Sequence, residues 1–163
     1  MFELRLTKAL ICIMIASYPL FVGYQNIIDY DTNYLFLQHT MKMDTIFPDS
    51  TLKVRAIENP VIWQLAYAVI IFCELITGLL FLIGGLKLMI HSKNPLKFKN
   101  SKTLIYYATF LGLGIWFFGF MVIAGEWFAS WQSSQWNGTN SAFRIASLLF
   151  LNLIFISQAE QDE

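Results

Sequence analysis

Four long apolar stretches occupy most of this chain of 163 residues, and they decide which solvent surrounds it. They cover roughly residues 6–28, 61–86, 104–127 and 142–157. The hydrocarbon core of a bilayer is about 30 Å thick, and about 20 apolar helical residues cross it. Three stretches are long enough; the last covers about 24 Å as a helix and needs a few further residues or local thinning of the bilayer. The pattern therefore predicts an integral membrane protein with four transmembrane helices.

The composition agrees with a chain that lies in lipid. Hydrophobic residues make up 56% of it and charged residues 13%, against about 25% charged in an ordinary soluble domain. The net charge is zero, which argues against a nucleic-acid partner, since such a partner needs a basic face. Cys12 and Cys73 are isolated inside predicted spans, so we expect no metal site, and we expect no cofactor. We expect a single membrane domain, residues 1–163, with membrane lipid as its surroundings.

The expected fold class is all-α, an antiparallel four-helix bundle with mostly short connections. The exception is the first outer, periplasmic loop, residues 29–60. Residues 34–43 are apolar on one helical face, which predicts a short helix along the membrane surface. The segment FPDSTL, residues 47–52, indicates a turn that leads into a second short helix.

Basic residues predict the orientation. Seven lie at the N-terminus and around the loop between the second and third spans, and three lie in the loop 29–60. The seven are Arg5, Lys8, Lys87, Lys93, Lys97, Lys99 and Lys102. Because cytoplasmic loops carry the excess of Lys and Arg, both termini are expected in the cytoplasm.

Charged residues inside the spans are the first candidates for function. They cost several kcal/mol at the centre of a bilayer by insertion scales, so they usually face protein or water. Glu74 lies near the middle of the second span, Glu126 near the outer end of the third, and Arg144 near the outer start of the fourth. Glu126 is expected either to form an ion pair with Arg144 that locks the last two helices together, or to serve a ligand.

Small residues predict which helix faces meet. Gly112, Gly119 and Glu126 recur every seven residues and so share one face of the third helix. On the second helix, Tyr67, Glu74, Gly78 and Gly85 share a stripe. Small residues let helices approach closely in lipid, so we expect the two glycine-lined faces, with their glutamates, to meet inside the bundle.

Two further polar features, one carboxyl and one pair of side chains, each allow two interpretations. Glu74 is expected either to be a protonated carboxyl bonded to a neighbouring tyrosine or backbone carbonyl, or to belong to a proton or cation path. In the outer loop, His39 and Asp44 are close enough in sequence to form an acid–base pair, although such pairs are common without catalysis.

Several runs near the outer side resemble a known family. They are HTMKMDTIFP at residues 39–48, RAIENP at 55–60, GFMVIAGEWF at 119–128, and the shorter runs at 131–133, 136–138 and 142–144. Together they resemble a bacterial family of predicted small integral membrane proteins, a domain of unknown function, although members often carry a second glycine where Ala124 stands. The resemblance implies a bacterial inner membrane and no particular activity. Any binding surface is expected on the outer face, from residues 38–60 and 119–144.

Three functional hypotheses follow, in order of preference. The chain has no cofactor motif and no nucleophile–base pair at a credible spacing, which favours a non-catalytic accessory subunit of a larger membrane complex or a homo-oligomer. The second hypothesis is a small-molecule or ion pathway that uses Glu74 and Glu126. The third is an enzyme that modifies lipid at the outer face with His39, Asp44 and Glu126.

Overall fold

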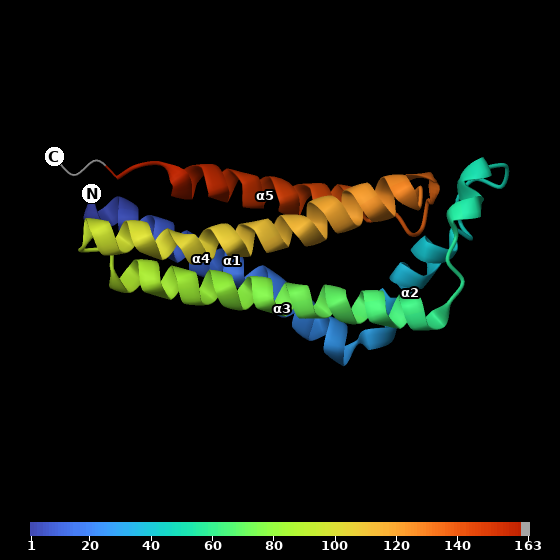
Figure 1. The fold of residues 1–163 in the computed structure, drawn as a ribbon, viewed down its shortest axis with the longest axis horizontal. Helices are drawn as coiled ribbons and strands as arrows, with labels where there is room; N and C mark the ends of the chain where they lie inside the picture. The colour runs from blue at the N-terminus through green and yellow to red at the C-terminus, as the bar shows by residue number, and fades with distance from the viewer. Residues whose placement is uncertain (161–163) are drawn as a thin grey trace.

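The computed structural model describes residues 1–160, and this part of the chain is helical without strands. Four long helical segments dominate it, and shorter helices lie in two of the three connections between them (Figure 1). The long segments are α1 (Phe2–Ile28), α3 (Pro60–Ile90), α4 (Pro95–Leu113) continued by the π-helix η2 (Gly114–Trp127), and α5 (Thr139–Ser157). The short ones are α2 (Tyr30–Lys42), η1 (Thr51–Arg55) and η3 (Ser130–Gln132). All four long segments are apolar and long enough to cross a membrane, as the sequence predicted.

Two of the long helices, α3 and α4, begin earlier than hydropathy alone indicates, and an asparagine caps each of them. Asn59 Oδ1 accepts a hydrogen bond from the backbone N–H of Val61 at 2.9 Å, and Pro60 occupies the first turn of α3. Asn94 caps α4 in the same way, with Lys97 as donor at 3.0 Å. The third span therefore starts at Pro95 rather than near residue 104, and most of its preceding lysines lie on a helix instead of in a loop.

Both helices expected in the first long connection are present, with different lengths. The chain leaves the helical conformation only at Asp29 before α2 begins, so α2 starts four residues earlier than the predicted segment. Met43 ends α2 in the left-handed conformation, with φ at 53°. The second helix is a 3-10 helix of five residues, η1.

Consecutive long helices run in alternating directions, so the molecule has two distinct ends (Figure 1). We call the end with α2 and η1 the loop end. We call the opposite end, where α1 begins and α5 finishes, the termini end. Helix α3 packs along both α1 and α4, and α5 lies against α4 and η2. The main buried apolar core, which includes Ala9, Cys12, Phe81, Leu88, Phe98 and Ile105, fills the termini end of the bundle and extends along α5 as far as Ala142.

Glycines allow α1 and α3 to pack closely. A Cβ atom on Gly78 would stand 2.5 Å from Leu20 Cγ and 3.0 Å from the Leu20 backbone nitrogen. A Cβ atom on Gly85 would stand 3.1 Å from the backbone nitrogen of Ile13. The glycine stripe of the second span is thus a close helix contact, but its partner is α1 rather than the third span.

The half of the third span toward the loop end is a π-helix of 14 residues. Its i→i+5 pattern continues to its end, where Phe128 N donates to Ile123 O at 3.0 Å. Such wide helical turns usually occur as single bulges, frequently at functional sites. Helix α3 packs much more closely with α4 than with η2, so the two spans separate toward the loop end.

Candidate functional site

A cavity of about 810 Å³ lies where α3 and η2 separate. Its walls come from α1, α2, α3 and η2, with contributions from the loop before α5 and from the start of α5. Small-molecule sites typically enclose about 300–1,000 Å³, so the volume suits a ligand. The sequence predicted no cavity here.

The π-helix supplies much of the cavity wall. Gly114 and Gly119 line the cavity, and a Cβ atom on Gly114 would meet no atom within 4 Å. Val69 of α3 and Phe118 of η2 also line it, although their side chains are 60% and 56% exposed. Apolar residues that both line the cavity and reach the surface of a transmembrane segment indicate an opening toward lipid. The cavity is therefore open on its membrane side.

A chain of hydrogen-bonded polar groups lines this apolar cavity. Asn33 Nδ2 on α2 donates to Asn26 Oδ1 on α1 at 2.6 Å, and Asn26 Nδ2 donates to Glu74 Oε2 on α3 at 2.8 Å. Tyr67 also donates its hydroxyl to the Asn26 backbone carbonyl at 3.4 Å. The side chains of Asn26, Glu74 and Tyr67 are buried. Asn26 therefore links three helices around the carboxyl of Glu74.

The described residues that line the cavity include an acidic side chain but no basic one. Among the described residues that line it, Glu74 is the single carboxylic acid, and there is no lysine, arginine or histidine. Only one oxygen of the Glu74 carboxyl accepts a hydrogen bond from the described residues. The buried hydroxyl of Thr40, which also lines the cavity, has no hydrogen-bond partner in that part of the chain. The cavity thus offers acceptor and hydroxyl groups against apolar walls.

The position of Glu74 in the interior could be predicted from the sequence, but its hydrogen-bond partner could not. The structure places Glu74 in the interior, bonded to an asparagine rather than to the tyrosine or carbonyl that was expected. The hydroxyl of Tyr67, on the same stripe of α3, donates to the backbone carbonyl of the same asparagine. A signal existed: Asn26 is a polar amide within an apolar predicted span, and buried polar groups are normally hydrogen-bonded.

Glu126 does not face the bundle interior, which corrects the prediction from its spacing. Both Glu126 and Arg144 are exposed, and no ion pair joins them among the interactions of residues 1–160. A seven-residue spacing defines one face only in an α-helix, whereas the segment from Gly114 to Trp127 is a π-helix with more residues per turn. The face that begins at the buried Gly112 has therefore rotated toward the surface by Glu126.

The acid–base pair expected in the first connection is formed. His39 Nδ1 lies 3.0 Å and 2.9 Å from the two oxygens of Asp44, and Lys42 Nζ lies 3.5 Å from the same carboxylate. The His39 ring stacks on Trp136, with centroids 4.6 Å apart and an interplanar angle of 9°. Glu126 makes no hydrogen bond to this pair within the described chain. The three groups of the enzyme hypothesis are therefore not brought together.

The two loops at the loop end contact each other through the runs that carry the family resemblance. Thr45 Oγ1 lies 2.9 Å from Ser133 Oγ, and Phe47 N donates to Gln132 Oε1 at 3.3 Å. Arg55 donates to the Trp127 carbonyl at 3.2 Å. These contacts hold the end of η2 against η1 and the turn after α2, and so fix one end of the cavity wall.

Metal binding finds no support in the geometry. Within the part of the chain that the structure describes, no three His, Cys, Asp or Glu side chains are grouped closely enough to hold a metal ion.

Comparison with known proteins identifies a family but no activity. Neither the curated proteins nor the solved structures contain a significant match to this chain. Residues 4–159 match a family described as predicted small integral membrane protein (DUF2165). This match covers nearly the whole chain, and the four apolar helices agree with it. The chain belongs to this family of predicted small integral membrane proteins and is a multi-pass membrane protein in contact with lipid.

Proposed function

We propose that the cavity binds a small amphiphilic molecule from the membrane, with an apolar body and a polar group that carries a positive charge or donates hydrogen bonds. The observation that carries this proposal is Glu74, whose buried carboxyl lines a large apolar cavity with one oxygen unpaired among the described residues. The accessory-subunit hypothesis, preferred from the sequence, remains a separate prediction.

Charge determines which ligands fit. An ionised carboxylate without a cation is costly in an apolar site, and a neutral carboxyl still offers one acceptor and one donor. A ligand with an amine or a hydroxyl group would satisfy the unpaired oxygen of Glu74 in either state. A ligand with a carboxylate or phosphate would find no basic side chain among the lining residues. We therefore expect amines to bind best, alcohols next, and acids worst.

The route to the cavity runs through the membrane. The exposed residues at its rim are apolar, and they belong to transmembrane segments. Toward the termini end, the bundle is filled by the apolar core, including Phe81, Leu88 and Ile105, each with no exposed surface. This arrangement supports a binding pocket with lateral access better than an ion pathway through the bundle.

Photolabelling in nanodiscs tests the proposal. Three probes with the same diazirine-bearing alkyl chain and an amine, hydroxyl or carboxylate end group are crosslinked, and labelled residues are mapped by mass spectrometry. Hydrogen bonds to charged groups are worth about 1.5–3 kcal/mol, so the amine should bind about 10- to 150-fold more tightly than the carboxylate. Its labels should fall on cavity residues, and Glu74→Gln should remove the preference.

A cavity-filling variant provides the steric test. Gly114→Leu places a side chain where the structure has open space, and should reduce labelling by all three probes. Ala68→Leu places the same side chain on an exposed part of α3 outside the cavity and should leave labelling unchanged. Labels spread evenly over lipid-facing residues, or insensitive to Gly114→Leu, would overturn the proposal.

We further propose that the loop end faces outward from a bacterial inner membrane, with both termini in the cytoplasm. The support is the excess of basic residues toward the termini end and the bacterial family that the sequence resembles. Single cysteines introduced at Glu3 and Asp49, in a background without Cys12 and Cys73, test this with an impermeant maleimide on intact cells. Labelling at position 49 alone is expected, and labelling at position 3 alone would reverse the orientation.

A further inference from the structure

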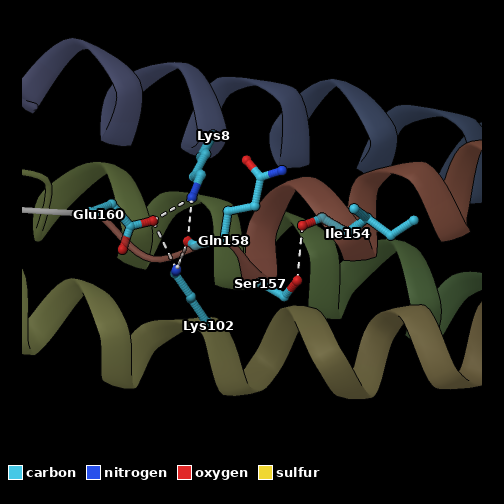
Figure 2. Close-up of polar contacts among 6 residues, drawn as sticks. All are labelled: Lys8, Lys102, Ile154, Ser157, Gln158 and Glu160. Carbon is cyan, nitrogen blue, oxygen red and sulfur yellow. Dashed lines mark hydrogen bonds and ion pairs between the residues drawn. The ribbon is translucent and has the colours of Figure 1, made fainter.

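Two lysines from different helices meet at the termini end and hold the segment that follows α5 (Figure 2). Lys8 on α1 and Lys102 on α4 both donate to Glu160 Oε1, Lys102 at 2.8 Å. Both also donate to the Gln158 carbonyl, at 2.8 Å and 3.1 Å. Four donor contacts from two ammonium groups thus converge on two oxygens of a short stretch of chain.

The ammonium groups are enclosed. The Lys8 side chain is 0% exposed, that of Lys102 is 5% exposed, and that of Glu160 is 7% exposed. Burial alone would raise the pKa of the Glu160 carboxyl, but the hydrogen bonds from Lys102 and Lys8 outweigh it and hold that pKa below its ordinary value. The site is therefore built for an anion, and a side chain of the protein itself occupies it.

The length of α5 explains why this site exists. Helix α5 has 19 residues, about 28 Å, whereas α3 has 31 residues, about 46 Å. The last helix ends before its neighbours do at the termini end, as Figure 1 shows. Residues 158–160 turn into the space between α1 and α4 that a longer helix would fill. Lys8 and Lys102 lie about 10 Å inside the ends of their helices, near the depth where headgroups meet hydrocarbon.

An apolar groove leads away from the same site. A second cavity of about 450 Å³ lies between α1 and α5, lined almost entirely by apolar side chains. Its lining includes Ile11, Met14, Leu148, Leu151 and Phe155. The Lys8 ammonium lies 5.5 Å from the centre of the Phe155 ring, so the groove reaches the lysine site. A basic site at headgroup depth beside an apolar groove matches the two parts of a phospholipid.

We propose that Lys8 and Lys102 form a binding site for the phosphate group of an anionic phospholipid, with one acyl chain in the groove between α1 and α5. Glu160 occupies the anion position in the structure and competes with the lipid. A phosphate offers several acceptor oxygens, so each lysine can donate to a separate one instead of sharing Oε1. Basic pockets between transmembrane helices commonly bind anionic headgroups in this way. This site has a different polar group from the cavity at the loop end, although the groove and the cavity share Tyr18 and Trp116 as lining residues.

Native mass spectrometry of the full chain tests the site. The purified protein is titrated with phosphatidylglycerol, phosphatidylcholine or inorganic phosphate, and the bound fraction is measured. Glu160→Gln removes the competing charge and keeps the length of the side chain. We expect it to raise the apparent affinity for phosphatidylglycerol at least about tenfold, equivalent to about 1.4 kcal/mol, and to leave the affinity for phosphatidylcholine unchanged. Glu3→Gln removes an exposed acid at the same end and should change neither.

Two variants in the Glu160→Gln background test the contributions of the lipid phosphate and of the acyl chain separately. Lys102→Gln should abolish the gain in affinity for phosphatidylglycerol, because it removes one of the two groups that bind the phosphate. Leu148→Trp fills the groove from an exposed position and should weaken the binding of phosphatidylglycerol but not that of inorganic phosphate. The control Ile154→Trp, which is exposed on the same helix outside the groove, should weaken the binding of neither. Because Leu148 and Ile154 are exposed, folding is not at risk from these changes.

The outcomes decide between lipid and free anion. A gain for phosphatidylglycerol that Lys102→Gln and Leu148→Trp remove supports the proposal. A gain for inorganic phosphate alone would overturn the lipid assignment. An equal gain for phosphatidylcholine, or no gain at all, would overturn the anion site.

Discussion

Asn26 is the residue on which the polar chain of the cavity depends, and its replacement gives the sharpest test of the site. Asn26→Leu keeps a similar volume but removes the hydrogen bonds to Glu74 and from Asn33. Asn33 is exposed, so its amide can bond elsewhere, but Glu74 is 2% exposed and loses its only side-chain donor among the described residues. The cost of this variant is therefore mainly the unpaired carboxyl.

The size of the expected loss in the free energy of unfolding depends on the lipid surroundings of the hydrogen bond. Hydrogen bonds between transmembrane helices average about 0.6 kcal/mol and reach about 1.7, because the unfolded chain in lipid also finds partners. Bonds to charged groups are worth about 1.5–3 kcal/mol in proteins generally. We expect Asn26→Leu to destabilise the fold by about 1–3 kcal/mol. Replacing both partners with apolar groups of similar shape is nearly neutral, so Asn26→Leu with Glu74→Leu should recover most of that loss.

The assay is reversible unfolding in mixed micelles, followed by circular dichroism, for the wild type, both single variants and the double variant. The four free energies form a double-mutant cycle, and the coupling between Asn26 and Glu74 should be at least about 1 kcal/mol. The double variant should also lose the amine preference of the photolabelling probes while remaining folded. A double variant as unstable as the sum of its two single variants would refute the reasoning, since the carboxyl and the amide would then not be coupled.

Three other regions give predictions that stability measurements can check. Gly78→Ala should destabilise by about 1–3 kcal/mol, because its Cβ would overlap Leu20, whereas Gly114→Ala should be neutral or stabilise by up to about 1 kcal/mol, and equal effects would contradict the packing described. The pKa of Glu160 is lowered in the folded state, so its ionised carboxylate stabilises the fold above about pH 4.5, the ordinary pKa of the group. The wild type should therefore be more stable than Glu160→Gln above that pH, and the difference should disappear as the pH falls below it. Thermal unfolding of both proteins across that range measures this difference. Exchanging the exposed Glu126 for Gln should change stability by less than about 0.5 kcal/mol, and a larger loss would indicate the ion pair with Arg144 that the structure lacks in its described part.

The number and class of helices could be predicted from the sequence because length and hydropathy are properties of a single segment. Their boundaries could not be predicted to the residue, since Asn59 and Asn94 act through capping bonds that hydropathy does not record. Glu74 could be identified as an interior carboxyl, because a charge in the middle of a span has few other places to lie. Its partner could not, since the choice between Tyr67 and Asn26 depends on which helix packs against α3.

The error over Glu126 has a more specific cause. Periodicity arguments assume one helical repeat, and a continuous apolar run such as residues 114–127 carries no sign of where the repeat changes. The π-helix that turns Glu126 outward also lines the cavity, with open space beside Gly114, so one change of helical repeat accompanies both features. Sequence reasoning therefore missed both for the same reason.

Tyr18 and Trp116 form the wall between the two cavities, and this gives a last prediction. Both residues line the cavity at the loop end and the groove between α1 and α5, and their ring centres lie 5.7 Å apart. Tyr18 is 42% exposed, so Tyr18→Ala removes the ring at a smaller cost than truncation of the buried Trp116. We expect the alkyl amine probe, confined to the first cavity in the wild type, to label groove residues such as Ile145 and Leu149 in this variant. Tyr18→Phe keeps the ring and should preserve the wild-type pattern; if Tyr18→Ala preserves it too, the two cavities are separated by more than this pair.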